Sequence, residues 1–158
     1  MFVLIKGRFL IEGINEIGPA LEIRREVFEK ELGLTRVQNE DGLDTLAVHG
    51  IVFDGQQPVA SGRMIYLSGR YLMDRVCVLS DHRRQYKGDF LVRMMCDRAF
   101  NSGATEVWLA LPCELLGLAK NIGFEDSGET QEFADRVLHL MKLPKDKFIS
   151  KCGHSCCH

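Results

Sequence analysis

The chain is organised around one stretch, which reads Arg75-Val76-Cys77-Val78-Leu79-Ser80-Asp81-His82-Arg83-Arg84-Gln85-Tyr86-Lys87-Gly88-Asp89-Phe90-Leu91. It begins with apolar residues typical of a strand and ends in helix-forming residues. The turn between them is basic. The first N–H groups of a helix lack internal partners, and the helix dipole adds positive charge there. The stretch therefore predicts a phosphate site to which Arg83, Arg84 and Lys87 add full charges. The alternative is an ordinary strand–helix junction with a solvated basic loop.

The composition is that of one globular domain. A chain of 158 residues can bury a sizeable core, and 46% hydrophobic and 27% charged residues are ordinary values. A net charge of −2 gives no bulk electrostatic reason to bind nucleic acid or a membrane. No apolar run approaches the roughly 20 residues that a membrane span needs, and residues 1–5 are too short for a signal-peptide core. We therefore expect a cytoplasmic protein.

The first half of the chain predicts a strand, a helix and a three-stranded meander. A strand is expected within residues 2–13, broken or bulged near Gly7. Gly18-Pro19 predicts the start of a helix that runs to Leu32, with Gly33 as its C-cap. Residues 35–44 are polar and predict a loop. Short turns then join strands at residues 46–53, 59–67 and 71–78.

The second half predicts a strand–helix–strand unit and a final strand. The helix after Gly88 is expected to run to about Asn101, and residues 105–111 form the next strand. The two strands that flank this helix should be parallel, with a right-handed crossover. A short helix at residues 112–121, a polar segment and a strand at residues 137–142 follow. The fold class is α+β with a mixed sheet.

This order of elements resembles that of the GNAT N-acetyltransferases, over about residues 21–142. The family's acetyl-CoA signature, Arg/Gln-x-x-Gly-x-Gly/Ala, aligns with Arg83 first and Gly88 last, while Tyr86 replaces the middle glycine. Further pieces resemble one subgroup of small bacterial members: Ile23-Arg24-Arg25-Glu26-Val27-Phe28, Asp41-Gly42-Leu43-Asp44, Ala47-Val48-His49, Pro58-Val59-Ala60-Ser61-Gly62-Arg63 and Ile122-Gly123-Phe124.

The resemblance implies a GNAT-like, mostly antiparallel mixed sheet with helices on both faces and a splayed central strand pair. Acetyl-CoA would lie between the strands at residues 75–79 and 105–111, its pantetheine pairing with the backbone at Val76, Cys77 and Val78. Asn121 could also bind the cofactor. The residues implied at the pyrophosphate are Arg83, Arg84, Gln85, Tyr86, Lys87, Gly88 and Asp89.

The resemblance also implies direct attack of a neutral amine, from a small molecule or a protein, on the thioester. Many members protonate the leaving thiolate with a tyrosine, which is Ala119 here. Asp74 and Cys113 are candidate catalytic groups, although a solvent-facing aspartate and a core cysteine are alternative interpretations. Tyr86 and Ala119 leave open a module that binds acyl-CoA with little turnover. A homodimer is compatible with the resemblance, which does not fix the oligomeric state.

A Cys/His-rich tail at residues 144–158 follows the GNAT-like domain at residues 1–143. Thiolates and imidazoles together suit zinc or a similar ion. This composition leaves a third hypothesis open, a metal- or redox-responsive protein, beside the alternative of a reactive tail without a ligand. The candidate zinc ligands are Cys152, His154, Cys156, Cys157 and His158.

Overall fold

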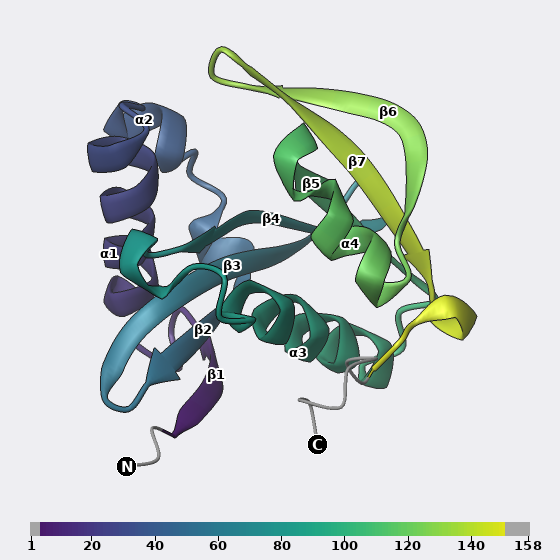
Figure 1. Ribbon diagram of the computed structural model, residues 1–158, viewed down its shortest axis with the longest axis horizontal. Helices are drawn as coiled ribbons and strands as arrows, with labels where there is room; N and C mark the ends of the chain where they lie inside the picture. Colours follow the sequence, from purple (N-terminus) through teal and green to yellow (C-terminus); the bar gives the residue numbers. More distant parts are fainter. Residues whose placement is uncertain (1–3, 151–158) are drawn as a thin grey trace.

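The computed structural model describes residues 4–150, which form a seven-stranded sheet flanked by helices (Figure 1). The strands lie in the order β1-β2-β3-β4-β5-β7-β6, and only β4 and β5 are parallel neighbours. This confirms the predicted α+β class with a mixed, mostly antiparallel sheet. The strands are β1 Ile5–Ile11, β2 Val48–Asp54, β3 Gln57–Leu67, β4 Arg70–Val78, β5 Glu106–Leu111, β6 Glu125–Phe133 and β7 Arg136–Pro144.

Four α-helices and several short helical turns connect the strands. Within residues 4–150, no helix is long and apolar enough to cross a membrane. The α-helices are α1 Gly18–Arg24, α2 Arg36–Asn39, α3 Lys87–Asn101 and α4 Leu116–Ile122. A π-helix, η1 Arg25–Glu31, continues α1, and the 3₁₀ turns are η2 Asp44–Leu46, η3 Ser80–His82, η4 Cys113–Leu115 and η5 Lys145–Lys147.

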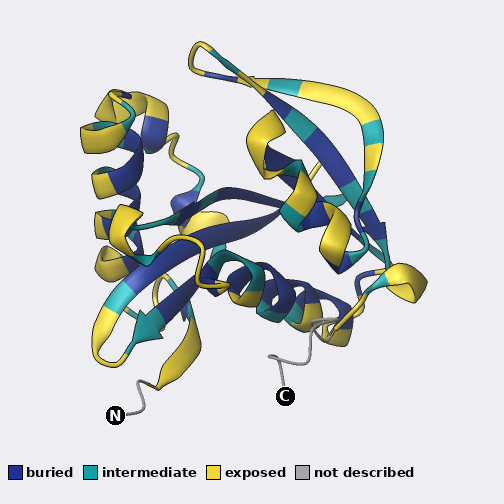
Figure 2. Ribbon diagram, viewed as in Figure 1, coloured by how far each residue is buried: buried dark blue, intermediate teal, exposed yellow. Residues whose placement is uncertain are grey.

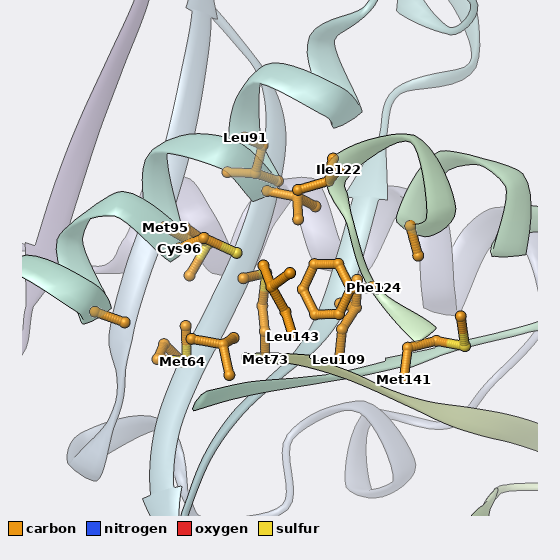
Figure 3. Close-up of a cluster of buried hydrophobic side chains, with 14 of the residues drawn as sticks. Met64, Met73, Leu91, Met95, Cys96, Leu109, Ile122, Phe124, Met141 and Leu143 are labelled. Atoms are coloured by element: carbon orange, nitrogen blue, oxygen red, sulfur yellow. The ribbon is translucent and has the colours of Figure 1, made fainter. Parts of the chain in front are cut away.

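The helices cover both faces of the sheet, as predicted. Neighbouring residues of one strand point to opposite faces, so Ile51 packs with α1 while Val52 packs with α3. The buried residues follow the inner sides of the helices and the central strands (Figure 2). On the side of α3 and α4, Leu91, Met95 and Ile122 meet side chains of the sheet (Figure 3). Each face therefore has its own apolar core.

Three local expectations differ from the structure. Strand β1 runs through Gly7 without interruption, and a Cβ there would collide with Met94 Sδ, so this glycine permits close packing against α3. Residues 36–39 form the short helix α2, which a capping box between Thr35 and Gln38 starts. The polar segment after Phe124 is the edge strand β6, whose mostly exposed residues carry no burial pattern that a sequence could reveal.

The chain stays packed beyond β7. The Phe148 ring lies 5.3 Å from the Phe100 ring between centroids, and the Ile149 N–H donates to the Ile122 carbonyl at 2.9 Å. The packed domain therefore continues past residue 143, where the sequence placed the start of the tail.

Substitution of Gly50 in β2 tests how closely the sheet packs against α3. A Cβ at this position would lie 2.7 Å from Met95 Sδ and 3.0 Å from Leu91 Cδ1. Because overpacking a dense core typically costs about 1–3 kcal/mol, Gly50→Ala should lower the free energy of unfolding by that amount in urea titrations. Gly117→Ala is the control, since nothing lies within 4 Å of its Cβ position. A Gly50→Ala protein as stable as the wild type would contradict this packing.

Candidate functional site

Strand β4 carries a β-bulge in the middle of the sheet. Between the pairs Ser61–Cys77 and Arg63–Asp74, β4 has two residues where β3 has one. The first of the two, Arg75, has a φ of 53°, in the left-handed region that costs a non-glycine residue about 1–2 kcal/mol. A bulge bends its strand and increases the local twist. Strand β4 therefore changes direction at Arg75.

Strands β4 and β5 separate just before this bulge. Their parallel pairing covers three positions and ends with Met73 opposite Leu109. Strand β5 continues to Leu111 with β7 as its strand partner. Backbone N–H and C=O groups of β4 beyond Met73 that face β5 therefore have no β5 partner. The expected splayed strand pair is confirmed, and it forms a V between the carboxyl-terminal parts of the two strands.

The N-terminus of α3 lies beside the end of β4. The Cβ position of Gly88 is 3.5 Å from Val78 Cγ2, and the first helical bond runs from the Phe90 N–H to the Tyr86 carbonyl. The N–H groups of residues 87–89 precede that bond and lack a helical partner. A helix N-terminus with open N–H groups attracts anions. The predicted phosphate turn is thus next to the V.

Arg83 bridges this turn to the end of the first helical segment. Its Nε donates to the Val78 carbonyl at 2.9 Å, and its two Nη groups donate to the Glu31 carboxylate at 2.7 Å each. The bonds from Arg83 lower the pKa of Glu31. Both side chains are about 38% exposed. Arg83 therefore already has an anionic partner, and it occupies a carbonyl at the open end of β4.

Lys87 and Arg84 differ in how far they are engaged. Lys87 is buried, its Nζ lies 3.2 Å from an Asp54 carboxylate oxygen, and it also donates to the Gln85 side chain. Arg84 is exposed and makes no ion pair with any residue in the range 4–150. Of the three predicted cations, Arg83 and Lys87 have a carboxylate partner within the described part of the chain and Arg84 has none there.

Tyr86 stands where the acetyl-CoA signature has its middle glycine, and its backbone also adopts a conformation typical of glycine. It has a φ of 62°, in the left-handed region that glycine enters without a steric cost, and it is the N-cap of α3. Its side chain is 60% exposed. The ring is therefore turned outward and is not packed into the turn.

A largely buried network of ion pairs, with Asp41 at its exposed edge, fixes the bulge from the side of α1. It joins α1, the segment from α2 to η2, and strands β3 and β4. Three positive and three negative side chains balance its charge, which favours burial because unpaired buried charges are very costly. Its charged members are Arg24, Arg63, Arg75, Asp41, Asp44 and Asp74.

Arg63 is the centre of this network. It donates to Asp74 at 2.8 and 3.0 Å, to Asp41 at 2.7 Å twice, and to Asp44 at 3.1 Å. Bonds from Arg63 lower the pKa of Asp41. Burial opposes ionisation of Asp44, but its bond from Arg24 prevails and lowers the pKa.

Asp74, a predicted catalytic group, is held by two arginines. Its oxygens accept the bonds from Arg63, and Arg75 Nη1 lies 3.5 Å away. Asp74 is 3% exposed. Its carboxylate therefore anchors the bulge, and the catalytic role suggested by the sequence stays a prediction that this geometry does not favour.

The remaining predicted residues lie on β4, in η4 and on α4. The Cys77 side chain is buried on the α1 side, where burial raises the pKa of its thiol to about 12, and its backbone lies opposite Ser61 of β3. Cys113 is exposed in η4, directly after β5, rather than in the core. Asn121 is exposed at the end of α4, and Ala119, at the family's tyrosine position, is fully buried.

The candidate zinc ligands at Cys152 and beyond lie outside the described residues. Within the described part of the chain, no group of three or more His, Cys, Asp or Glu side chains could hold a metal ion.

Comparison with known sequences finds relatives among acetyltransferases. No family model matches the chain. The chain is 28% identical over 132 residues to YjcF of Bacillus subtilis (strain 168), described as an uncharacterized N-acetyltransferase, and the match covers 84% of this chain and 94% of that protein.

Comparison with solved structures finds the same fold. An acyl-CoA N-acyltransferase from Pseudomonas aeruginosa matches with a TM-score of 0.74 and 22% identity, over 88% of this chain and 99% of that one. The PaiA N-acetyltransferase from Thermoplasma acidophilum, solved in complex with coenzyme A, matches with a TM-score of 0.67 and 12% identity, over 89% and 99%. Other matching structures are described as GNAT-family acetyltransferases. The predicted GNAT fold is therefore confirmed.

The buried network predicts a stability that falls with acidification. The pKa values of Asp41 and Asp44 are lowered below 3.8 in the folded protein, and burial lowers that of His49 below 6.5. The unfolded chain therefore binds more protons in these ranges. The free energy of unfolding should decrease below about pH 6.5 and more steeply below about pH 4.

Urea titrations from pH 7 to pH 3 measure this dependence. Asp41→Asn should be less stable at pH 7 and should lose less stability between pH 5 and pH 3, because it lacks one of the titrating groups. Wild-type and Asp41→Asn curves of equal slope over that range would show that Asp41 does not carry this acid sensitivity.

Proposed function

We propose that the chain is an N-acetyltransferase of the GNAT superfamily and that it moves an acetyl group from acetyl-CoA to a primary amine by direct attack; its likeness to YjcF and its GNAT fold support this. The observation that carries this proposal is the V between β4 and β5, with the N-terminus of α3 beside it. Open backbone groups along β4 suit the amides of pantetheine, and a helix N-terminus suits a pyrophosphate. The two features lie next to each other, as one extended cofactor requires.

The proposed cofactor site divides into a backbone part and a charged part. Pantetheine amides would pair with the backbone of Val76 and with the N–H of Val78, since Arg83 holds the Val78 carbonyl. The pyrophosphate would accept bonds from the N–H groups of residues 87–89 and from Arg84. Lys87 would keep the turn in place through Asp54, and Arg83 would reach the phosphates only after leaving Glu31.

The amine would enter from the side of α1. There the Phe28 and Phe133 rings lie 5.8 Å apart between centroids, in edge contact, and the Arg75 guanidinium lies 3.9 Å from the Phe133 ring centroid. These contacts join η1 to the β6–β7 hairpin. Burial beside a guanidinium disfavours a charged ammonium, through desolvation and like charge, and so favours the neutral amine, which is the nucleophile.

In the proposed reaction, the amine nitrogen attacks the thioester carbon and forms the new C–N bond. A backbone N–H of β4 would donate to the oxyanion that develops. The C–S bond then breaks and the electron pair leaves on the CoA sulfur. The amine proton passes to water, and the thiolate takes a proton from water or from the exposed Cys113 thiol, since Ala119 offers none.

Release of free CoA in the presence of an amine panel tests the proposed activity. Spermidine, lysine, an aminoglycoside and a peptide with a free N-terminus represent small and protein-derived amines. We expect at least one to raise CoA release at least tenfold above the amine-free rate, together with an acetylated product detected by mass spectrometry. Acetyl-CoA binding without acetylated product from any of a broad panel would instead support a binding module.

Titration calorimetry with acetyl-CoA tests the roles proposed for Arg83 and Arg84 at the pyrophosphate. Glu31→Gln should tighten binding about two- to fivefold, because a half-exposed ion pair is worth up to about 1 kcal/mol and its loss frees Arg83. Arg84→Ala should weaken binding about three- to tenfold, since it removes a charge-assisted bond to phosphate. Lys6→Ala, on the exposed strand β1, is the control and should change nothing. Weaker binding by Glu31→Gln would refute the competition between Glu31 and the pyrophosphate.

A further inference from the structure

A cavity lies at the carboxyl-terminal end of α3. It has a volume of about 150 Å³ and lies between the carboxyl-terminal half of α3 and strands β1 to β4. Its walls are largely apolar and include Phe9, Val48, Met64 and Met95. The helix rises 1.5 Å per residue, so Arg98 lies about 16 Å along the axis from the first turn of α3. The cavity is therefore separate from the proposed acetyl-CoA site.

Arg98 supplies an unengaged positive charge at this cavity. Its guanidinium carbon lies 5.1 Å from the centroid of the Phe9 ring, which also lines the cavity. The side chain is half-buried, and its guanidinium makes no hydrogen bond or ion pair with any residue that the structure describes. Five N–H donors in a planar fork are thus available at an apolar wall.

A neighbouring cavity also contains an arginine, but that arginine already has a carboxylate partner. That cavity is polar, and it shares Tyr66 and Tyr71 with the first. Its arginine, Arg70, is already engaged, since it pairs with Glu129 at 3.0 Å and lies 3.7 Å from the centre of the Trp108 ring. Arg98 also lies beside a ring, that of Phe9, but no carboxylate among residues 4–150 pairs with it.

Size and charge together define a ligand class. An apolar cavity of about 150 Å³ accommodates a group of roughly the size of benzene. A planar guanidinium binds a carboxylate through two parallel bonds. Ser102 also lines the cavity, and a serine hydroxyl can donate. A dianionic phosphate would find one cation among apolar walls, so a monoanion fits better.

We propose that this cavity binds a small aromatic or branched monocarboxylate, with its ring among Phe9, Val48, Met64 and Met95 and its carboxylate on Arg98. The carbonyls at the end of α3 oppose an anion here, but they carry only about half a charge. A full charge in bidentate contact outweighs them. The guanidinium gains an anionic partner, which residues 4–150 do not supply.

Benzoate is the probe, and it is titrated into the full chain while amide chemical shifts are followed by NMR. We expect residues around Phe9, Met64 and Arg98 to shift with a dissociation constant of about 1 mM or tighter. Saturating CoA should leave this binding unchanged. The result would therefore be independent of whether the proposed transferase activity is found.

Matched variants decide whether the carboxylate contact is real. Arg98→Met keeps the chain length and apolar stem and should weaken benzoate binding at least tenfold. Arg8→Met makes the same change at an exposed position of β1 and should have no effect. Ala99→Leu, which extends a cavity-lining side chain, should also abolish binding while Arg98 stays in place. Thermal unfolding checks that each variant is folded.

Three results would overturn the proposal. The first is the absence of any shift around the cavity up to about 10 mM benzoate, roughly ten times the expected dissociation constant. The second is equal binding by wild type and Arg98→Met. The third is binding of neutral benzyl alcohol as tightly as benzoate, because the assigned class depends on the charge.

Discussion

The bulge at Arg75 is the constraint on which the rest of the structure depends. A continuous β4 would keep pairing with β5 past Met73, and the sheet would close. The left-handed turn at Arg75 bends the strand away and leaves its backbone open. This conformation is costly in isolation, so surrounding contacts must hold it. The arginine–aspartate network does so, because Arg63 binds the residue before the bulge while Arg75 reaches back to Asn39 and Asp41.

The same network links the two sides of the proposed active site. Arg24 lies in α1, Asp44 in η2 and Asp74 in β4. One charge-balanced cluster therefore joins α1, on the side proposed for the amine, to β4, the strand proposed to bind the cofactor. Removing one partner from a buried pair leaves an uncompensated charge, which is strongly destabilising. This explains why Asp74 is better understood as an anchor of β4 than as an acid or base.

The phosphate turn shows what a motif can and cannot predict. The sequence identified the turn, the helix start and the cations. It could not reveal that Glu31, 52 residues earlier, pairs with Arg83, or that Asp54 pairs with Lys87. Ion pairs between distant elements carry no local periodicity. One clue to the network was present, since Arg63 stands as a charged residue within an apolar strand, and such a residue is rarely buried unless it is paired.

By itself, the sequence determined the class and order of elements, because hydrophobic periodicity and Gly/Pro turns are local signals. It also showed that Tyr86 replaces a family glycine and that Ala119 replaces the family tyrosine, whereas the left-handed, exposed conformation of Tyr86 came from the structure. Tertiary structure alone decided where β4 leaves β5, that polar residues 125–133 form a strand, which cations are paired, and that a cavity forms beside Arg98. These features depend on contacts between segments far apart in the chain, and a pattern within one segment does not encode them.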